Sequence, residues 1–190
     1  MRALIVYATR EGQTRRIAMR MADDLRAHGS KVDVFNADSI GTLDWSKYFT
    51  ACIAASVHAG KHEPEMVAFA RTYRDELQRL HAAFISVTLS EATVEGFARS
   101  EDERRQAAGD VQRMIDDFVK ATGWTPPRTL PVAGALTYSK YNIFMRFVMK
   151  RIARKAGGPT DTSRDYEFTN WPAVEQFARE LGAGGQREIV

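Results

Sequence analysis

The residues with the clearest chemical meaning lie in the decapeptide YATREGQTRR, residues 7–16. An apolar run ends at Thr9, a single glycine follows at position 12, and an arginine-rich segment with helical periodicity begins directly after it. The unpaired N–H groups and the dipole at a helix start favour an anion, and the hydroxyls of Thr9 and Thr14 add donors. We predict that this turn binds one phosphate monoester; the alternative is an ordinary capped turn.

Other nucleotide-binding motifs match this turn poorly. It lacks the Gly-Lys-Ser/Thr ending of a triphosphate loop and the three glycines of a dinucleotide fingerprint, whereas one glycine suffices to fold the chain tightly around a small tetrahedral group. The predicted phosphate-binding residues are Thr9, Arg10, Glu11, Gly12, Gln13 and Thr14.

The elements that must position this turn follow from apolar periodicity. Strands are expected at residues 2–8, 31–37, 48–56, 82–89 and 129–136, and helices at 13–27, 64–80, 101–122 and 171–182. This alternation predicts an α/β domain over residues 1–190 with a parallel sheet covered by helices on both faces. Residues 165–169 are expected to add a short strand, and residues 182–190 to form a frayed tail.

Cysteine usage and hydropathy indicate where such a chain works. Cys52 is the only cysteine and lies in the apolar run ACIAAS, so we expect a core residue rather than a nucleophile. The sequence shows neither a signal-peptide pattern nor an apolar run long enough to span a bilayer. These features predict a reducing, cytoplasmic location.

The positive charge is concentrated in residues 140–155, KYNIFMRFVMKRIARK, which hold six basic residues and no acid. Without them the chain's 27 basic residues would fall to 21, against 24 acidic ones. On a helical wheel Ile143 and Phe147 fall among the basic side chains. The predicted apolar arc, expected to pack on the domain, contains Tyr141, Phe144, Met145, Val148, Met149, Ile152 and Ala156.

Three partners suit a basic helix of this kind. An anionic membrane surface attracts such charges, and a tetrapyrrole with propionates would pair with arginine. Nucleic acid is disfavoured because no nucleic-acid motif accompanies the helix. The plainer interpretation is an insertion whose charges only face water.

The pattern Thr-x-x-Gly-x-Thr after an N-terminal strand resembles the phosphate loop of flavodoxins, which bind flavin mononucleotide (FMN). ASVHAG (55–60) and SVTLSEATVEG (86–96) stand where flavodoxin-like proteins place their flavin-ring loops. The resemblance implies a flavodoxin-like, doubly wound, five-stranded parallel sheet with a basic helical insertion (137–165) before the last helix. It places the first of these segments near N5 and one face of the flavin ring, through Ser56, Val57, His58, Ala59 and Gly60. It places the second along the pyrimidine edge of the ring, through Thr88, Leu89 and Ser90.

Longer stretches resemble one branch of that family, the menaquinone-dependent protoporphyrinogen oxidases. The matching pieces span nearly the whole chain: TREGQTRRIA, ASVHAGKH, FISVTL, VAGALTYSKYNIFMRFVMKRIARKAGGPTDT and YEFTNWPAVEQFARE. The resemblance implies FMN-dependent oxidation of protoporphyrinogen IX, with menaquinone or ubiquinone as acceptor, at the inner face of the cell membrane. The implied substrate or membrane contacts are Tyr141, Arg146, Phe147, Lys150, Arg151 and Arg154.

Some features of the branch stay open. A flavodoxin-type electron carrier and an FMN-dependent NAD(P)H:quinone reductase are the alternatives, and a homo-oligomer is left open. No catalytic side chain is assigned, and no metal site is expected, because His58 and His62 lack a supporting ligand pattern. His58 is either a flavin or proton-transfer contact or a surface histidine. Phe97 is a distant candidate for stacking on the ring, and the acidic segment 91–103 is either a changed substrate rim or a solvated helix start.

Overall fold

The five long apolar segments form one parallel sheet, as the sequence predicts. The computed structural model describes residues 1–155 and 158–184. Its strands run in the order β2-β1-β3-β5-β6, all of them parallel to their neighbours. Their bounds are β1 (Arg2–Ala8), β2 (Lys31–Asn36), β3 (Thr50–His58), β5 (Ala83–Thr88) and β6 (Arg128–Ala133). This is a doubly wound order, and the topological switch point lies between β1 and β3, where ligands bind in such sheets.

The central strands are buried on both faces. In the register of the sheet, Ile5 of β1 lies opposite Val34 of β2 and Cys52 of β3. Cys52 is fully buried, and burial raises the pKa of its thiol to about 12. The prediction that Cys52 belongs to the core is therefore confirmed.

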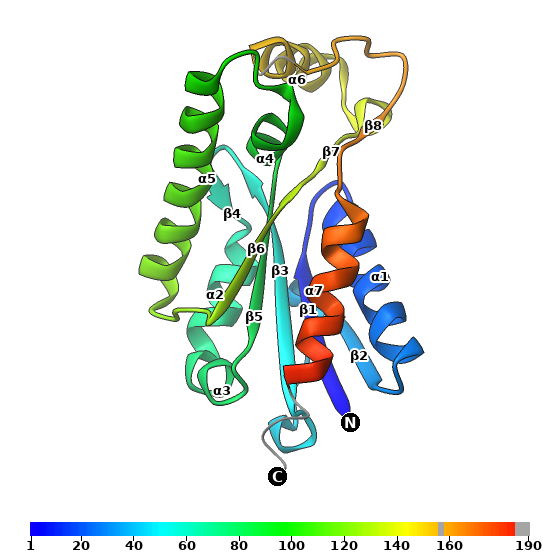
Figure 1. The fold of residues 1–190 in the computed structure, drawn as a ribbon, viewed down its shortest axis with the longest axis vertical. Helices are drawn as coiled ribbons and strands as arrows, with labels where there is room; N and C mark the ends of the chain where they lie inside the picture. Colours follow the sequence, from blue (N-terminus) through cyan, green and yellow to red (C-terminus); the bar gives the residue numbers. More distant parts are fainter. Residues whose placement is uncertain (156–157, 185–190) are drawn as a thin grey trace.

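Helices cover both faces of the sheet (Figure 1). On one face, α1 (Gln13–Ala27) and α7 (Trp171–Gly184) bury apolar side chains such as Met21 and Leu181 against the strands. On the other face lie α2 (Pro64–Thr72), α3 (Arg74–Arg79) and α5 (Glu101–Thr122), with Phe118 in the core. Residues 182–184 are the last turn of α7 rather than a tail, and residues 185–190 of the expected tail lie outside the described residues.

Several predicted boundaries are corrected. The helix expected at 64–80 is interrupted at Tyr73, which leaves helical geometry (φ −109°, ψ 29°) and packs its ring 5.0 Å from that of Trp45. The third strand continues to His58 and turns back into β4 (Lys61–His62), so Ser56, Val57 and His58 belong to a strand. Short 3-10 turns, η1 (Ala37–Ser39) and η2 (Trp45–Lys47), connect β2 to β3.

The strand expected at 129–136 is divided at Gly134. A Cβ there would lie 3.4 Å from Val87 Cγ1, so the chain passes close to β5 at the point where it leaves the sheet. The next two residues form β7 (Ala135–Leu136), which pairs antiparallel with β8 (Tyr166–Glu167). The extra strand expected within 165–169 is thus confirmed.

The insertion lies beyond the carboxyl edge of the main sheet, at the top of Figure 1. It contains the 3-10 turn η4 (Tyr138–Lys140) and the helix α6 (Ile143–Lys155). At the same edge, α4 (Leu89–Ala92) and a π-helical turn, η3 (Thr93–Phe97), follow β5. Within residues 1–155 and 158–184, no helix combines the length and the apolar character that crossing a bilayer requires.

The predicted apolar arc of α6 is partly wrong. The helix begins at Ile143, so Tyr141 precedes it. Phe144, expected to pack inward, is 74% exposed, and Ile143 and Phe147 are also exposed, whereas Arg146 is half-buried. The helix is rolled so that Ala153 contacts the small cluster around Tyr138. Of the other residues on that arc, Ala156 and the side chains of Met145 and Ile152 lie outside those described.

Candidate functional site

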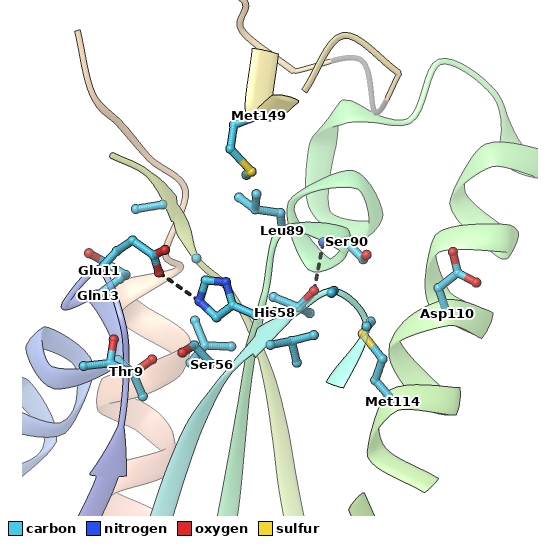
Figure 2. A pocket seen from close by; sticks show the side chains of 18 of the residues that line it. Thr9, Glu11, Gln13, Ser56, His58, Leu89, Ser90, Asp110, Met114 and Met149 are labelled. Carbon is cyan, nitrogen blue, oxygen red and sulfur yellow. Dashed lines mark hydrogen bonds and ion pairs between the residues drawn. The ribbon is translucent and has the colours of Figure 1, made fainter. Parts of the chain in front are cut away.

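A cavity of about 320 Å³ opens at the carboxyl ends of β1, β3, β5 and β6. That volume falls in the range of about 300–1,000 Å³ usual for small-molecule sites. The three segments singled out in the sequence, 9–14, 56–60 and 88–90, converge on it (Figure 2). Of their residues, Arg10 and Gly12 do not reach its wall. The lining residues from these segments are Thr9, Glu11, Gln13, Thr14, Ser56, Val57, His58, Ala59, Gly60, Thr88, Leu89 and Ser90.

The turn before α1 has the geometry of an anion site. Gly12 is left-handed (φ 99°), and its N–H donates to Thr9 Oγ1 at 3.0 Å. No side chain caps α1, which leaves the first N–H groups of the helix without a side-chain acceptor. Thr14 is fully buried, and its Oγ1 has no hydrogen-bond partner among the described residues. A phosphate at this turn would satisfy these donors, so the residues present fit such a group.

Gln13 and Arg10 make side-chain contacts that support the turn; Gln13 also lines the cavity, whereas Arg10 does not. Gln13 Nε2 donates to Glu167 Oε1 at 2.7 Å and to Thr169 Oγ1 at 2.8 Å, which ties the start of α1 to β8 and the residues after it. Arg10 Nε donates to Glu63 Oε2 at 3.0 Å. These contacts give both side chains a supporting role in the turn, and their predicted contact with a cofactor stays a prediction.

His58 lies at the edge of the cavity beside Glu11 (Figure 2), and a second carboxylate, that of Glu63, also approaches it. Its Nε2 lies 2.9 Å from Glu11 Oε2 and 3.3 Å from Glu63 Oε1, although neither approach has the angles of a hydrogen bond. Glu63 is 1% exposed and accepts a hydrogen bond from Ser56 Oγ at 2.9 Å, in addition to the one from Arg10. A buried carboxylate requires such partners. His58 is thus part of an acid–histidine cluster and not a free surface histidine.

The β3–β4 turn presents its backbone to the cavity. Ala59 (φ 48°) and Gly60 (φ 77°) both have positive φ, as in the tight turns that join paired strands. Leu89, predicted to end the strand 82–89, and Ser90, expected in the loop after it, instead begin α4, and Thr88 Oγ1 accepts the Ser90 N–H at 3.1 Å. Peptide groups therefore border the cavity at both segments.

Other cavity residues were not predicted as cofactor contacts. They come from the ends of β5 and β6, from α5 and from the insertion: Val87, Gly134, Ala135, Asp110, Arg113, Met114, Tyr141 and Met149. Tyr141, predicted as a substrate or membrane contact, supplies an aromatic ring, and burial raises the pKa of its hydroxyl. Phe97 packs edge-on against Phe168 at 4.7 Å between ring centroids and is not in the wall. Met114 lies on the helix predicted at 101–122, but no local signal in the sequence directs it to this cavity.

The remaining predicted contacts lie on α6. Arg146 and Lys150 are half-buried, whereas Phe147, Arg151 and Arg154 are exposed, and none of the five lines the cavity. In the acidic segment 91–103, Glu91 is half-buried. Its burial and the negative charge of the neighbouring Glu95 both raise its pKa, so this part of the segment is more than a solvated helix start. Among the described residues, no cluster of His, Cys, Asp or Glu side chains is arranged to hold a metal ion.

The fold and cavity define a doubly wound α/β protein with a ligand site at the switch point. The family model described as "Flavodoxin domain" matches residues 4–163. The chain therefore belongs to the flavodoxin domain family.

Solved structures agree on the fold. A flavodoxin from the domain Archaea gives a TM-score of 0.51 at 12% identity over 98% of this chain and 99% of that one. A short-chain flavodoxin associated with a non-canonical PDU bacterial microcompartment gives 0.55 at 16% identity over 97% and 99%.

Two curated relatives share a name. The chain is 34% identical over 181 residues to protoporphyrinogen IX dehydrogenase [quinone] of Escherichia coli (strain K12), covering 95% of this chain and 94% of that protein. It is 28% identical over 186 residues to the protein of the same name from Leishmania major, covering 96% of this chain and 75% of that one. The similarity thus extends through the insertion to α7.

Proposed function

We propose that this protein is an FMN-dependent oxidoreductase that converts protoporphyrinogen IX to protoporphyrin IX and passes the electrons to a quinone. The observation that carries the proposal is the end-to-end similarity to relatives of that name. The uncapped turn with the orphaned Thr14 hydroxyl supports it independently, because FMN ends in a phosphate monoester.

Each cavity segment has a task in this proposal. The N–H groups at the start of α1 and the Thr14 hydroxyl hold the phosphate, and Gly12 keeps side-chain atoms out of the turn. The backbone of residues 56–60 lies against the flavin ring, and residues 88–90 border its pyrimidine edge. FMN, when bound, supplies the electron transfer. The protein supplies position, a surface shielded from water and a charged cluster at the ring.

The acid–histidine cluster gives the site a place to hold a proton. Porphyrinogen oxidation releases protons as well as electrons, so a titratable side chain beside the cofactor is useful. His58 Nε2, between the carboxylates of Glu11 and Glu63, is the atom we assign to this role.

The insertion binds the substrate from above the cavity. Tyr141 and Met149 give the cavity an apolar upper wall against which a macrocycle can lie. Arg146 Nε is buried and has no hydrogen-bond partner among the described residues, so a propionate carboxylate would satisfy it.

The exposed side of the insertion binds an anionic membrane surface peripherally, on the inner face of the cell membrane. Ile143, Phe144 and Phe147 are 89%, 74% and 66% exposed, and the basic Arg151 and Arg154 on the same helix are exposed as well. Large apolar side chains among basic ones are typical of interfacial helices. Because quinones dissolve in lipid, this placement would bring the acceptor to the site.

One reaction tests the activity. Under anaerobic conditions, FMN-loaded protein is mixed with protoporphyrinogen IX and a soluble menaquinone analogue, and porphyrin fluorescence is followed. We expect porphyrin to form only when quinone is present. If the flavin is reduced by an artificial donor and reoxidised by quinone, but porphyrin does not exceed the protein-free background, the protein is a carrier. Rapid reduction by NAD(P)H would instead indicate a quinone reductase.

A further inference from the structure

The phosphate turn receives a cation from the insertion, far along the chain. Lys140 Nζ donates a hydrogen bond to the backbone oxygen of Glu11, 129 positions earlier. A Cβ built on Gly12 would lie 3.4 Å from the same ammonium. The ammonium therefore lies directly beside the peptide that joins these two residues.

Lys140 differs from three arginines near the turn in what it pairs with. Arg10 is bound to Glu63 at 3.0 Å, Arg16 to Glu167 at 3.1 Å, and Arg20 to Glu175. The hydrogen bond of Lys140 goes to a neutral carbonyl instead. An ammonium has three N–H donors, so this contact does not exhaust the charge or the donors of Lys140.

The contact continues as a chain of hydrogen bonds into the turn. Lys140 polarises the Glu11 carbonyl, whose peptide carries the Gly12 N–H, and this N–H donates to Thr9 Oγ1 at 3.0 Å. Linked hydrogen bonds strengthen one another, and the Thr9 hydroxyl keeps its own proton to donate to a ligand. Asp165 anchors the residue before the lysine, because it accepts hydrogen bonds from the N–H and hydroxyl of Ser139 at 2.8 and 2.6 Å.

The need for a cation comes from acidic neighbours. The carboxylate of Glu11 lies in the cavity wall, so a phosphate at the turn meets a like charge nearby. The buried, unpartnered hydroxyl of Thr14 points independently to a ligand at this helix start.

We propose that Lys140 is a positioning residue for the cofactor phosphate: it clamps the turn from outside and supplies the charge that makes the protein select FMN over riboflavin. This inference rests on the proposed function, because it presumes that the turn holds the phosphate of FMN. It also gives the insertion a second task, since the element that contacts the substrate then stabilises the cofactor.

Binding of FMN and of riboflavin, which lacks the phosphate, tests the proposal. The full-length chain is freed of flavin, and both dissociation constants are measured by quenching of flavin fluorescence. For Lys140→Met we expect FMN binding to weaken about tenfold to a hundredfold, the range for losing one close charge, with riboflavin binding changed less than about threefold. Lys140→Arg should retain most of the preference. Lys47→Met, an exposed lysine paired with Asp44, is the control for losing one positive charge.

The outcomes separate the two proposals. If the unmodified protein binds neither flavin, the proposed function fails. If it prefers FMN, and Lys140→Met keeps that preference or weakens both flavins equally, the role of Lys140 is overturned while the FMN site stands. Salt gives a measurement on the unmodified chain: its preference for FMN should shrink with rising ionic strength, and Lys140→Met should lose most of that dependence.

Discussion

The floor of the cavity and the insertion above it are built on different principles. The floor is made of strand ends and the turns after them, whose positions follow from a buried parallel sheet with fixed register. The insertion, with η4 and α6, packs on the domain through the small cluster around Tyr138, and Ile143, Phe144 and Phe147 are turned to the outside. Local sequence therefore determines the floor, whereas the insertion depends on contacts across the fold and on whatever covers its exposed side.

The contrast predicts where single substitutions do most damage. In the floor, Gly12→Glu should weaken FMN binding more than about a hundredfold, because a side chain at φ 99° strains the turn and its carboxylate repels the phosphate. Flavin retained through purification, read as absorbance per protein, is the measurement.

Gly109→Glu provides the matched control for this substitution. Gly109 lies exposed on α5, where a Cβ meets nothing within 4 Å, so its replacement should leave the flavin bound. A yellow, folded Gly12→Glu protein would show that the turn does not hold the phosphate, and would remove the distinction between floor and insertion.

The parts predicted correctly from the sequence share this local origin. An apolar run followed by a single glycine specifies both β1 and the turn that shapes the site, and Cys52 falls in the core because its whole strand is buried. No local signal in the sequence indicates that Lys140 lies beside the turn, because its partner Glu11 is 129 positions away in the chain. The roll of α6 was mispredicted because both of its sides carry large apolar residues, so periodicity alone does not identify the side that faces the domain.

The buried side chain of His62, in β4, should make the stability of the fold sensitive to pH. His62 is buried against Phe84 and Phe118, and burial lowers its pKa to about 4. The unfolded chain, with an ordinary histidine pKa near 6.5, therefore binds more protons between pH 4 and pH 6.5. The contribution of His62 to the free energy of unfolding should therefore be constant above this window. It should fall by about 3 kcal/mol as the pH drops through the window.

Urea unfolding at several pH values, compared between the unmodified chain and His62→Gln, isolates this contribution. Carboxylates with lowered pKa, such as that of Asp33, act in the same direction at lower pH in both proteins and cancel in the difference. A difference that does not change between pH 4 and pH 7 would contradict the assignment of His62 as a neutral buried group.

Glu63 supports the floor through its buried carboxylate. Glu63→Gln removes the charge that Arg10 and His58 face and should destabilise the fold by about 1–3 kcal/mol, the usual cost of leaving buried polar groups poorly paired. The free energy of unfolding in urea is the measurement. Asp75→Asn, at a carboxylate that is 84% exposed, should change it by less than about 0.5 kcal/mol. Equal effects of the two substitutions would mean that the cluster around Glu63 has no special role in stability.

The smallest expected effect belongs to the insertion and tests what covers its exposed side. Each basic residue near an anionic lipid surface contributes about 1 kcal/mol, so Arg154→Gln should weaken binding to vesicles containing anionic lipid about fivefold. Arg105→Gln removes another exposed arginine, which lies on α5 and pairs with Asp102, and should have almost no effect. Binding to neutral vesicles should be weak for the unmodified chain and both variants, because the apolar residues of α6 act alone there.

If the two substitutions weaken binding to anionic vesicles equally, the attraction is spread over the whole surface, and the exposed side of α6 needs a different partner. If Arg154 alone matters, α6 is the part of the molecule that faces the membrane, and its outward apolar residues have a reason that packing within the fold does not provide.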